Sequence, residues 1–284
     1  MIRRLCIVLV VALIAFPLIA AGGGEEGSSE GGMALENTPD DPRLYEPGKL
    51  TVATGEPVYP PWMLDDNPAG GEGFENAMVY ALAEQLGFDR DDVVWLRQNF
   101  DQGIAPGAKP YDFNIQQFSV TEARREFVDF SIVYYQPDKA VVALPESGLS
   151  NARTFADLKE ARWGATIGTT DLDYIENLIG GGKVAVYDDQ VGTFQALLAK
   201  QIDATVISLP TALFATAVQI PEATIAAILP FDPNDLGHGL VFEKGNGLVE
   251  WINEGLEAII SAGVVEELTA KYLVGDDSIP EIAE

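Results

Sequence analysis

Short apolar runs alternate with segments of helical period from residue 49 to residue 273, and this alternation limits the fold more than any other feature. KLTVATGEP (49–57) and VDFSIVYY (128–135) have the composition of strands. Between them, GFENAMVYALAEQLGF (73–88) has apolar residues at 74, 77, 78, 81, 82 and 86, a helical spacing that Gly87 can end. Alternating strands and helices predict an α/β layer architecture.

A second α/β unit follows the first along the chain. The sequence KAVVAL (139–144) predicts its first strand, and LVEWINEGLEAIISAGVVEELTAKYL (248–273) predicts an amphipathic helical pair split near Gly263. Two further strands are expected in the first unit, and several strands and helices in the second; these lie in 91–98, 111–121, 154–161, 162–170, 171–179, 184–189, 191–201, 203–218 and 236–245.

The N-terminal residues 1–21 have the pattern of a secretory signal sequence. Arg3 and Arg4 precede an apolar run, and small residues surround a possible cut after Ala20 or Ala21. An uncleaved anchor is the alternative, although a run this short, interrupted by Pro17, is marginal for a membrane span. We therefore expect an extracytoplasmic protein, in the periplasm or at the cell surface.

Two segments outside the α/β pattern are expected to stay unpacked. Residues 22–47 begin with a tract rich in Gly, Ser and Glu, which predicts a flexible linker before a folded part that starts near Gly48. The end of the apolar run, LIAAGGG, has no cysteine for lipid attachment, and Cys6 lies inside the signal. Residues 276–284 form an acidic tail, expected to be solvated.

Composition excludes several classes of function. The chain has 17 Lys+Arg against 44 Asp+Glu, a formal charge of −27, which argues against binding to nucleic acid or to anionic lipid. One Cys and one His leave little material for a zinc site, a thiol enzyme or a Ser-His triad. We expect a monomer with no cofactor, no metal and no catalytic residues.

Six segments resemble, in order, the amino-acid-binding proteins of ABC importers, which are solute-binding proteins of family 3 with the type II periplasmic-binding-protein fold. The resemblance covers about residues 48–275 and is carried by KLTVATGEPVYPPW, GFENAMVYALAEQLG, YDFNIQQFSVTEARREFVDFSIVYY, WGATIGTTDLDYI, IDATVISLPTALF and GLVFEKGNGLVEWINEGLEAIISAG.

The resemblance implies two α/β lobes joined by two crossover strands, with a ligand cleft between the lobes. The crossings should fall near Tyr134–Lys139 and Asn234–His238. Lobe 1 would then hold 48–135 and 238–275, and lobe 2 would hold 139–233.

Such a protein captures an amino acid or a related small carboxylate by hinge closure, and its closed form delivers the ligand to an ABC permease. Two alternatives share the fold. A cleft-based lyase or dehydratase would need an acid beside the carboxylate-binding arginine. A ligand-sensing ectodomain would act with a partner receptor.

The family's TxxR motif implies the carboxylate-binding residues of lobe 1. Thr121 and Arg124 have its spacing, which makes Arg124 the anchor; a guanidinium matches a carboxylate with two parallel hydrogen bonds. Arg125 points elsewhere if this turn is helical, and we assign it to solvent or a surface pair. Ser119 would present a hydroxyl and an N–H to the same carboxylate, and the carbonyl of Gln117 would accept from the ammonium.

From lobe 2, the resemblance places Gly168, Thr169 and Thr170 before a helix, where backbone N–H groups bind anions. The alternative for this segment is an ordinary helix N-cap. Tyr59 and Phe100 match the aromatic walls of the family's cleft. We expect Trp62 to lie in the core or at the rim, and His238 to pack at the hinge.

The ammonium site departs from the family's pattern. Ser208 stands where the family has an Asp that pairs with the amine, and a buried unpaired ammonium is costly. Three interpretations stay open: Glu56 pairs with the amine from lobe 1, the ligand lacks a primary ammonium, or the site binds weakly. Asn114, where an acid could also sit, is neutral and gives no help.

Overall fold

The computed structural model describes residues 37–273, 275–276 and 278–283. The predicted signal sequence and the first part of the predicted linker lie outside these residues. Within the described ranges, no helix has both the length and the apolar character needed to cross a bilayer.

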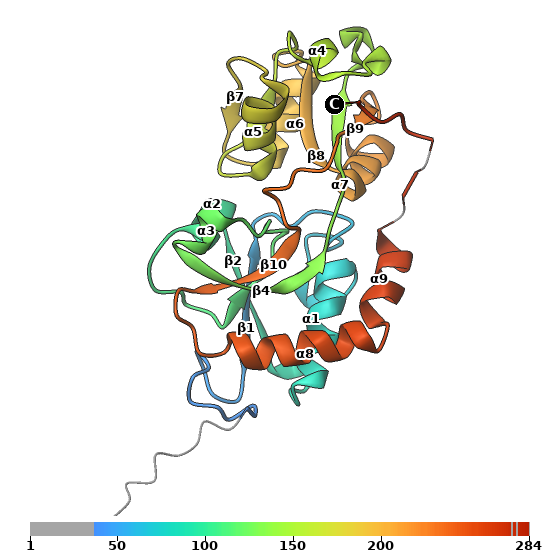
Figure 1. The fold of residues 1–284 in the computed structure, drawn as a ribbon. Helices are drawn as coiled ribbons and strands as arrows, with labels where there is room; N and C mark the ends of the chain where they lie inside the picture. The colour runs from blue at the N-terminus through green and yellow to red at the C-terminus, as the bar shows by residue number, and fades with distance from the viewer. Residues whose placement is uncertain (1–36, 274, 277, 284) are drawn as a thin grey trace, which may run out of the picture. The chain divides into compact units, whose positions relative to one another are not determined.

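Lobe 1, as we use the term, is built on a five-stranded sheet with the order β2-β1-β3-β10-β4 (Figure 1). β1 pairs in parallel with β2 and with β3, whereas β10 runs antiparallel to both β3 and β4. The bounds are β1 Leu50–Gly55, β2 Val93–Gln98, β3 Phe113–Asn114, β4 Val128–Tyr135 and β10 His238–Glu243.

The helices of lobe 1 include the amphipathic segments that the sequence predicts. α1 (Phe74–Gln85) packs against α8 (Val249–Ser261), where a Cβ on Gly255 would lie 2.7 Å from Leu82 Cδ1, so glycine permits this close approach. α8 and α9 (Val264–Tyr272) are separated at Gly263, with φ of +79°. Short helices that the sequence did not predict follow β2 and β3; they are α2 Phe100–Ile104 and α3 Glu122–Arg125.

Lobe 2 contains a three-stranded sheet, β8-β5-β9, and a two-stranded sheet, β6-β7. Its hydrophobic core forms two clusters that share no buried residue. Its strands are β5 Lys139–Ala143, β6 Gly164–Thr166, β7 Ala185–Tyr187, β8 Ala204–Ser208 and β9 Thr224–Ile228; its α-helices are α4 Phe155–Leu158, α5 Thr170–Tyr174, α6 Gln190–Leu198 and α7 Leu209–Phe214.

Shorter helical segments complete both lobes. Two π-helical turns extend α5 and α7, at Ile175–Ile179 and Ala215–Gln219. The 3₁₀ turns are Pro68–Gly70, Arg90–Asp92, Pro145–Ser147 and Leu149–Asn151.

The chain passes from the first sheet to the second between Tyr135 and Lys139, and it returns between Ile228 and His238. β9, which ends at Ile228, was not predicted from the sequence. We call these two connections the first and second crossovers.

Residues 37–47 pack onto lobe 1, so their assignment to the flexible linker is wrong. Leu44 is 4% exposed and belongs to the core of the lobe. The buried Asp112 carboxylate accepts hydrogen bonds from the N–H groups of Tyr45 (2.7 Å) and Thr51 (2.6 Å), which ties this stretch to β1. The apolar Leu44 offsets the ordering of a polar segment.

The described part of the acidic tail also packs, which corrects the prediction of a solvated end. Beyond α9, Glu281 bridges Ile228 and Ala283 bridges Thr154, so the tail lies alongside β9 in lobe 2 (Figure 1). Ile282 donates its N–H to the Ile228 carbonyl at 2.9 Å. Its side chain is 5% exposed in the lobe 2 core. The acidic tail contains two isoleucines, Ile279 and Ile282, and burial of their apolar surface favours its packing on lobe 2.

Candidate ligand-binding site

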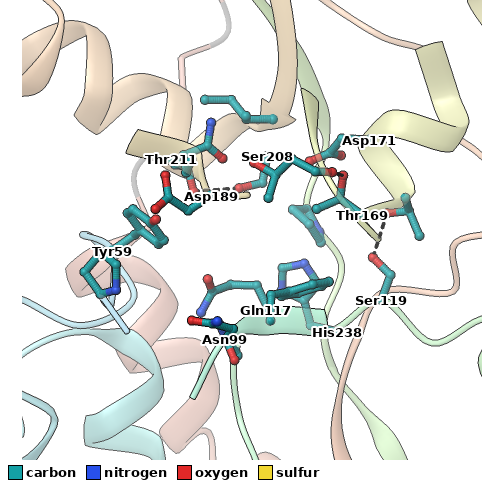
Figure 2. Close-up of a pocket in the computed structure, with 18 of the residues that line it drawn as sticks. Tyr59, Asn99, Gln117, Ser119, Thr169, Asp171, Asp189, Ser208, Thr211 and His238 are labelled. Atoms are coloured by element: carbon teal, nitrogen blue, oxygen red, sulfur yellow. Dashed lines mark hydrogen bonds between the residues drawn. The ribbon is translucent and has the colours of Figure 1, made fainter. Parts of the chain in front are cut away.

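A pocket lies between the lobes, and nearly all of the predicted site residues line it. Figure 2 shows Asn99, Gln117 and His238 along one edge and Asp189, Ser208 and Asp171 along the opposite edge. The predicted residues that line the pocket are Glu56, Tyr59, Phe100, Gln117, Ser119, Arg124, Thr169, Thr170 and Ser208.

Arg124 is fixed in this pocket by both lobes. It lies in the one-turn helix α3, whose N-cap Thr121 accepts from the Arg124 N–H at 3.2 Å. The guanidinium donates to the Ser119 carbonyl at 2.7 Å and to the Gly168 carbonyl at 2.8 Å. Its Cζ lies 5.6 Å from the Phe100 ring centroid, within the range of a cation–π contact. In the described ranges Arg124 forms no ion pair.

Arg125 has the surface position expected for it. Its Nε lies 3.5 Å from Glu122 Oε1, three residues earlier in the same turn, and 41% of its side chain is exposed. Exposed pairs of this kind contribute little to stability. The two adjacent arginines therefore face different environments, because successive residues of a helix point about 100° apart.

The hydroxyls expected to face a ligand carboxylate bind a carboxylate of the protein instead. Ser119 Oγ donates to Asp235 Oδ2 at 2.8 Å, and Thr170 Oγ1 donates to the same oxygen at 2.9 Å. Burial works to raise the pKa of Asp235, but nearby Lys139, the Ser119 hydroxyl and the Gly237 N–H outweigh it and lower the pKa to about 2. Only the backbone N–H groups of these two residues can still serve a ligand in the expected way.

Lys139 is a second cation in the pocket wall that the sequence did not reveal. Its Nζ lies 2.6 Å from Asp171 Oδ1 and 3.1 Å from Asp235 Oδ2, and only 11% of its side chain is exposed. Burial opposes its charge, yet the two carboxylates prevail and raise the pKa of Lys139. Unlike Arg124, Lys139 is neutralised within the protein.

Gly168 and Thr169 have contacts that differ from their predicted roles. Gly168, with φ of +73°, contributes its carbonyl to Arg124. Thr169 is the N-cap of α5: its Oγ1 accepts from the Leu172 N–H at 3.2 Å and donates to the Thr166 carbonyl at 2.8 Å. The N-cap alternative therefore describes the Thr169 hydroxyl.

Gln117 is held by a buried acid beneath the pocket. Its N–H donates to Glu75 Oε1 at 2.9 Å, its side-chain amide donates to Oε2, and its φ is +52°. The Tyr134 hydroxyl donates to Glu75 Oε1 at 2.5 Å. Glu75 is fully buried, and burial raises its pKa to about 7 although these hydrogen bonds oppose the shift. Glu75 therefore fixes both the backbone and the side chain of Gln117, and the side-chain amide points toward Glu75.

Ser208, which stands where the resemblance implies an ammonium-binding Asp, belongs to a row of hydrogen-bonded side chains that are all neutral. Ser208 Oγ and Thr211 Oγ1 lie 2.8 Å apart, and Trp62 Nε1 donates to Thr211 Oγ1 at 2.8 Å. Trp62 is 1% exposed, a core residue as expected, and this bond links lobe 1 to lobe 2. None of the three side chains, Ser208, Thr211 and Trp62, carries a formal charge.

Four acids line the pocket, and two of them are engaged. Asp171 pairs with Lys139, and Asp189 is the N-cap of α6, accepting from the Gly192 N–H at 2.7 Å. Glu56 and Asp188 are exposed to solvent at the pocket. Glu56 adjoins the Tyr59 wall in sequence, which keeps it a candidate partner for an amine.

The family model for bacterial extracellular solute-binding proteins, family 3, matches residues 50–275. The chain belongs to this family. The family's fold therefore underlies the two lobes and the pocket between them, as the order of the six sequence segments predicted.

Individual relatives of this family 3 protein are distant in sequence. The L-cystine-binding protein TcyJ of Escherichia coli K12 is 26% identical over 86% of this chain and 91% of that protein. The ABC transporter arginine-binding protein 1 of the same strain is 28% identical over 76% and 87%. The solved structure of an ancestral arginine-binding protein bound to arginine is 28% identical, covers 80% of this chain and 99% of that one, and has a TM-score of 0.68.

His238 of this family 3 protein packs at the second crossover, as predicted, and also lines the pocket. It is 4% exposed, and its ring centroid lies 5.2 Å from that of Trp62. Burial lowers its pKa to about 3, so the imidazole is neutral at physiological pH. It therefore brings hydrogen-bonding capacity to the pocket without charge.

Several of the pocket residues missed from the sequence lie within two residues of the end of a strand. Asn99 follows β2, Asp188 follows β7, and the side chains after strand ends meet at one edge of a parallel sheet. That pattern was available as a signal. The residues that reasoning from the sequence did not assign to the site are Pro57, Asn99, Gln116, Pro137, Lys139, Thr166, Asp171, Asp188, Asp189, Gln190, Ile207, Thr211 and His238.

Proposed function

We propose that this family 3 protein binds an amino acid outside the cytoplasm, holding its carboxylate on Arg124, and delivers it to an ABC permease. The observation that supports this most strongly is the state of Arg124. Its guanidinium lines the pocket and contacts carbonyls of both lobes, and within the described residues it has no carboxylate partner.

A pocket guanidinium with no carboxylate in direct contact favours an anionic group on the ligand, although Asp235, Asp171 and Asp173 lie near enough to act on its charge. Carbonyl oxygens satisfy some of its donors but do not neutralise its charge, and a carboxylate can accept two of its N–H groups side by side. Because one accepting carbonyl is from Ser119 and the other from Gly168, a ligand held on this guanidinium would lie where the two lobes meet. That is the arrangement in which a ligand favours the closed state.

For the amine we favour Glu56. Ser208 is neutral, Asp171 is paired with Lys139, and Asp189 caps α6. Asp188 is also exposed at the pocket, and we favour Glu56 over it because Glu56 adjoins the Tyr59 wall in sequence. Relatives named for cystine and for arginine support a ligand with an α-ammonium group. An exposed carboxylate such as Glu56 retains water in competition with the amine, so its contribution should be smaller than that of Arg124.

Binding without catalysis fits the chemistry of the buried acid near the carboxylate site. A dehydratase needs a group that can give up a proton at physiological pH. Asp235, which contacts Ser119 and Thr170, has a pKa lowered to about 2 and stays ionised. Glu75 has a pKa raised to about 7, but it is fully buried and does not line the pocket. The monomeric state, the permease and an extracytoplasmic location complete the proposal.

Calorimetric titration of the purified protein with the twenty amino acids and with small amine-free carboxylates tests the proposal. We expect saturable one-to-one binding of at least one amino acid, and no product when the mixture is analysed afterwards. Conversion of a bound compound would contradict it. Binding of amine-free acids alone would keep Arg124 as the anchor but would exclude amino acids as the cargo.

Delivery to a permease needs a second experiment. Uptake of the radiolabelled amino acid should fall in cells that lack this protein and return when it is supplied. Normal uptake without the protein would leave binding intact and remove the transport role.

A further inference from the structure

Asp235 is a buried carboxylate of the second crossover that contacts both lobes. It is 6% exposed. Its Oδ2 accepts from Ser119 of lobe 1 at 2.8 Å and from Thr170 of lobe 2 at 2.9 Å. Its Oδ1 accepts from the Gly237 N–H at 3.1 Å, within the crossover itself.

The first crossover joins the same group of side chains. Lys139 Nζ lies 3.1 Å from Asp235 Oδ2 and also donates to Thr170 Oγ1 at 3.0 Å. Gln136 Nε2 donates to the Asp235 carbonyl at 3.3 Å. We call Ser119, Lys139, Thr170, Asp171 and Asp235 the hinge clasp. It joins both crossovers to the segments of each lobe that carry the predicted carboxylate site.

Opening of the cleft must break part of the hinge clasp. One oxygen cannot keep Ser119 and Thr170 once these residues move apart, because each hydrogen bond is under 3 Å. A buried charge that loses a donor has to be rehydrated or stays uncompensated, and both are unfavourable. None of these bonds includes a ligand atom.

We propose that Asp235 is a positioning residue that holds the two lobes together before any ligand binds. In doing so it fixes the Ser119 and Thr170 segments around Arg124. The effect on ligand affinity rests on the proposed function, whereas the effect on the lobes does not. A larger closed population in the free protein tightens binding, because affinity scales with the binding-competent fraction.

The test measures the distance between the lobes in the absence of ligand. Spin labels or dyes are placed at Gln102→Cys in lobe 1 and Glu176→Cys in lobe 2, both exposed positions, in full-length protein carrying Cys6→Ser. Asp235→Ala removes the carboxylate, and Asp235→Asn restores one acceptor oxygen without the charge. Asp112→Ala is the matched control, because Asp112 is as buried but contacts only lobe 1.

We expect the ratio of closed to open molecules to fall about tenfold in Asp235→Ala, the effect of losing hydrogen bonds to a buried charged group. Asp235→Asn should fall between this variant and the wild type, and Asp112→Ala should match the wild type. Circular dichroism checks that each variant is folded. If Asp235→Ala does not fold, Thr170→Val, which removes only the lobe 2 bond, should shift the ratio in the same direction.

Equal distance distributions for the wild type, Asp235→Ala and Thr170→Val would overturn the proposal, and so would a wild type that is fully open. Titration with L-arginine on the same samples separates the two proposals. If no variant binds L-arginine but the distances shift, the hinge clasp stands and L-arginine is not the ligand. If L-arginine binds the wild type and Asp235→Ala equally while the distances are unchanged, the clasp falls and the binding function stands.

Discussion

The two ends of the pocket differ in charge. At one end Arg124 provides a fixed charge, oriented by carbonyls from both lobes. At the other end Ser208 belongs to an uncharged chain with Thr211 and Trp62, which also spans the lobes. The comparison shows a fixed positive charge at one end of the pocket and none at the other, and in our proposal the amine is left to exposed Glu56.

Removal of the charged end should have the largest effect on binding. Arg124→Ala should weaken binding of an amino acid at least about 30-fold, because truncating one partner of an enclosed charge pair costs about 2–5 kcal/mol. Arg125→Ala, which removes the neighbouring surface arginine, should leave the affinity within about twofold. Calorimetry of both variants measures this difference. Equal losses would show that the charge of the turn, rather than the position of Arg124, matters.

Loosening of lobe 2 should change stability without changing either end of the pocket. Ile282→Ala should lower the free energy of unfolding by about 2–4 kcal/mol, the usual cost of truncating a buried isoleucine. Ile279, which is only partly buried, is the control, and Ile279→Ala should cost less. Urea unfolding measures both. Wild-type stability of Ile282→Ala would mean that the tail does not dock on β9.

The acid beneath the pocket should make stability depend on pH. The native pKa of Glu75 is about 7 against an ordinary value of 4.5, so the folded state binds more protons in between. The free energy of unfolding contributed by Glu75 is therefore highest below pH 4.5 and is lost as the pH rises through about 7. Glu75→Gln should lack this change.

The measurement for Glu75 is the difference in unfolding free energy between the wild type and Glu75→Gln across that pH interval. The difference should shift against the wild type as the pH rises. Glu84→Gln, at an exposed position on α1, controls for the loss of one negative charge. A constant difference would contradict the assignment of a protonated Glu75 at low pH.

Adding a carboxylate at Ser208, in the neutral end of the pocket, should change ligand affinity less than removing Arg124. Ser208→Asp should strengthen binding of amino acids about tenfold and weaken binding of amine-free carboxylates, because the new carboxylate attracts only the amine. Calorimetry with matched pairs, such as an amino acid and its deaminated analogue, gives the comparison. Equal changes for both members of a pair would mean that the amine does not lie near Ser208.

Reasoning from the sequence succeeded where local order carries the information. Helix α1 follows from its apolar spacing, and the position of Arg124 in the pocket follows from a motif of four residues. Such features need no knowledge of distant partners. The short helices α2 and α3 are too brief for a periodic signal.

Features that depend on distant contacts were missed. Lys139 and Asp235 are 96 positions apart in the sequence, and nothing near either residue indicates that they meet. Ser119 was assigned to a ligand because the family resemblance implies a hydroxyl facing the carboxylate at that position, whereas the sequence does not reveal its acceptor Asp235. Ile282 lies in an acidic tail, where composition suggested solvent, yet an apolar side chain needs only one open strand edge to dock.

A crystal structure of the protein with L-arginine bound would test the central claim most directly. We predict that the ligand carboxylate accepts hydrogen bonds from the Arg124 guanidinium, with its amine toward Glu56. Clear density for the ligand with its carboxylate away from Arg124 would contradict the account, and so would an Arg124 that turns out of the pocket when the ligand binds.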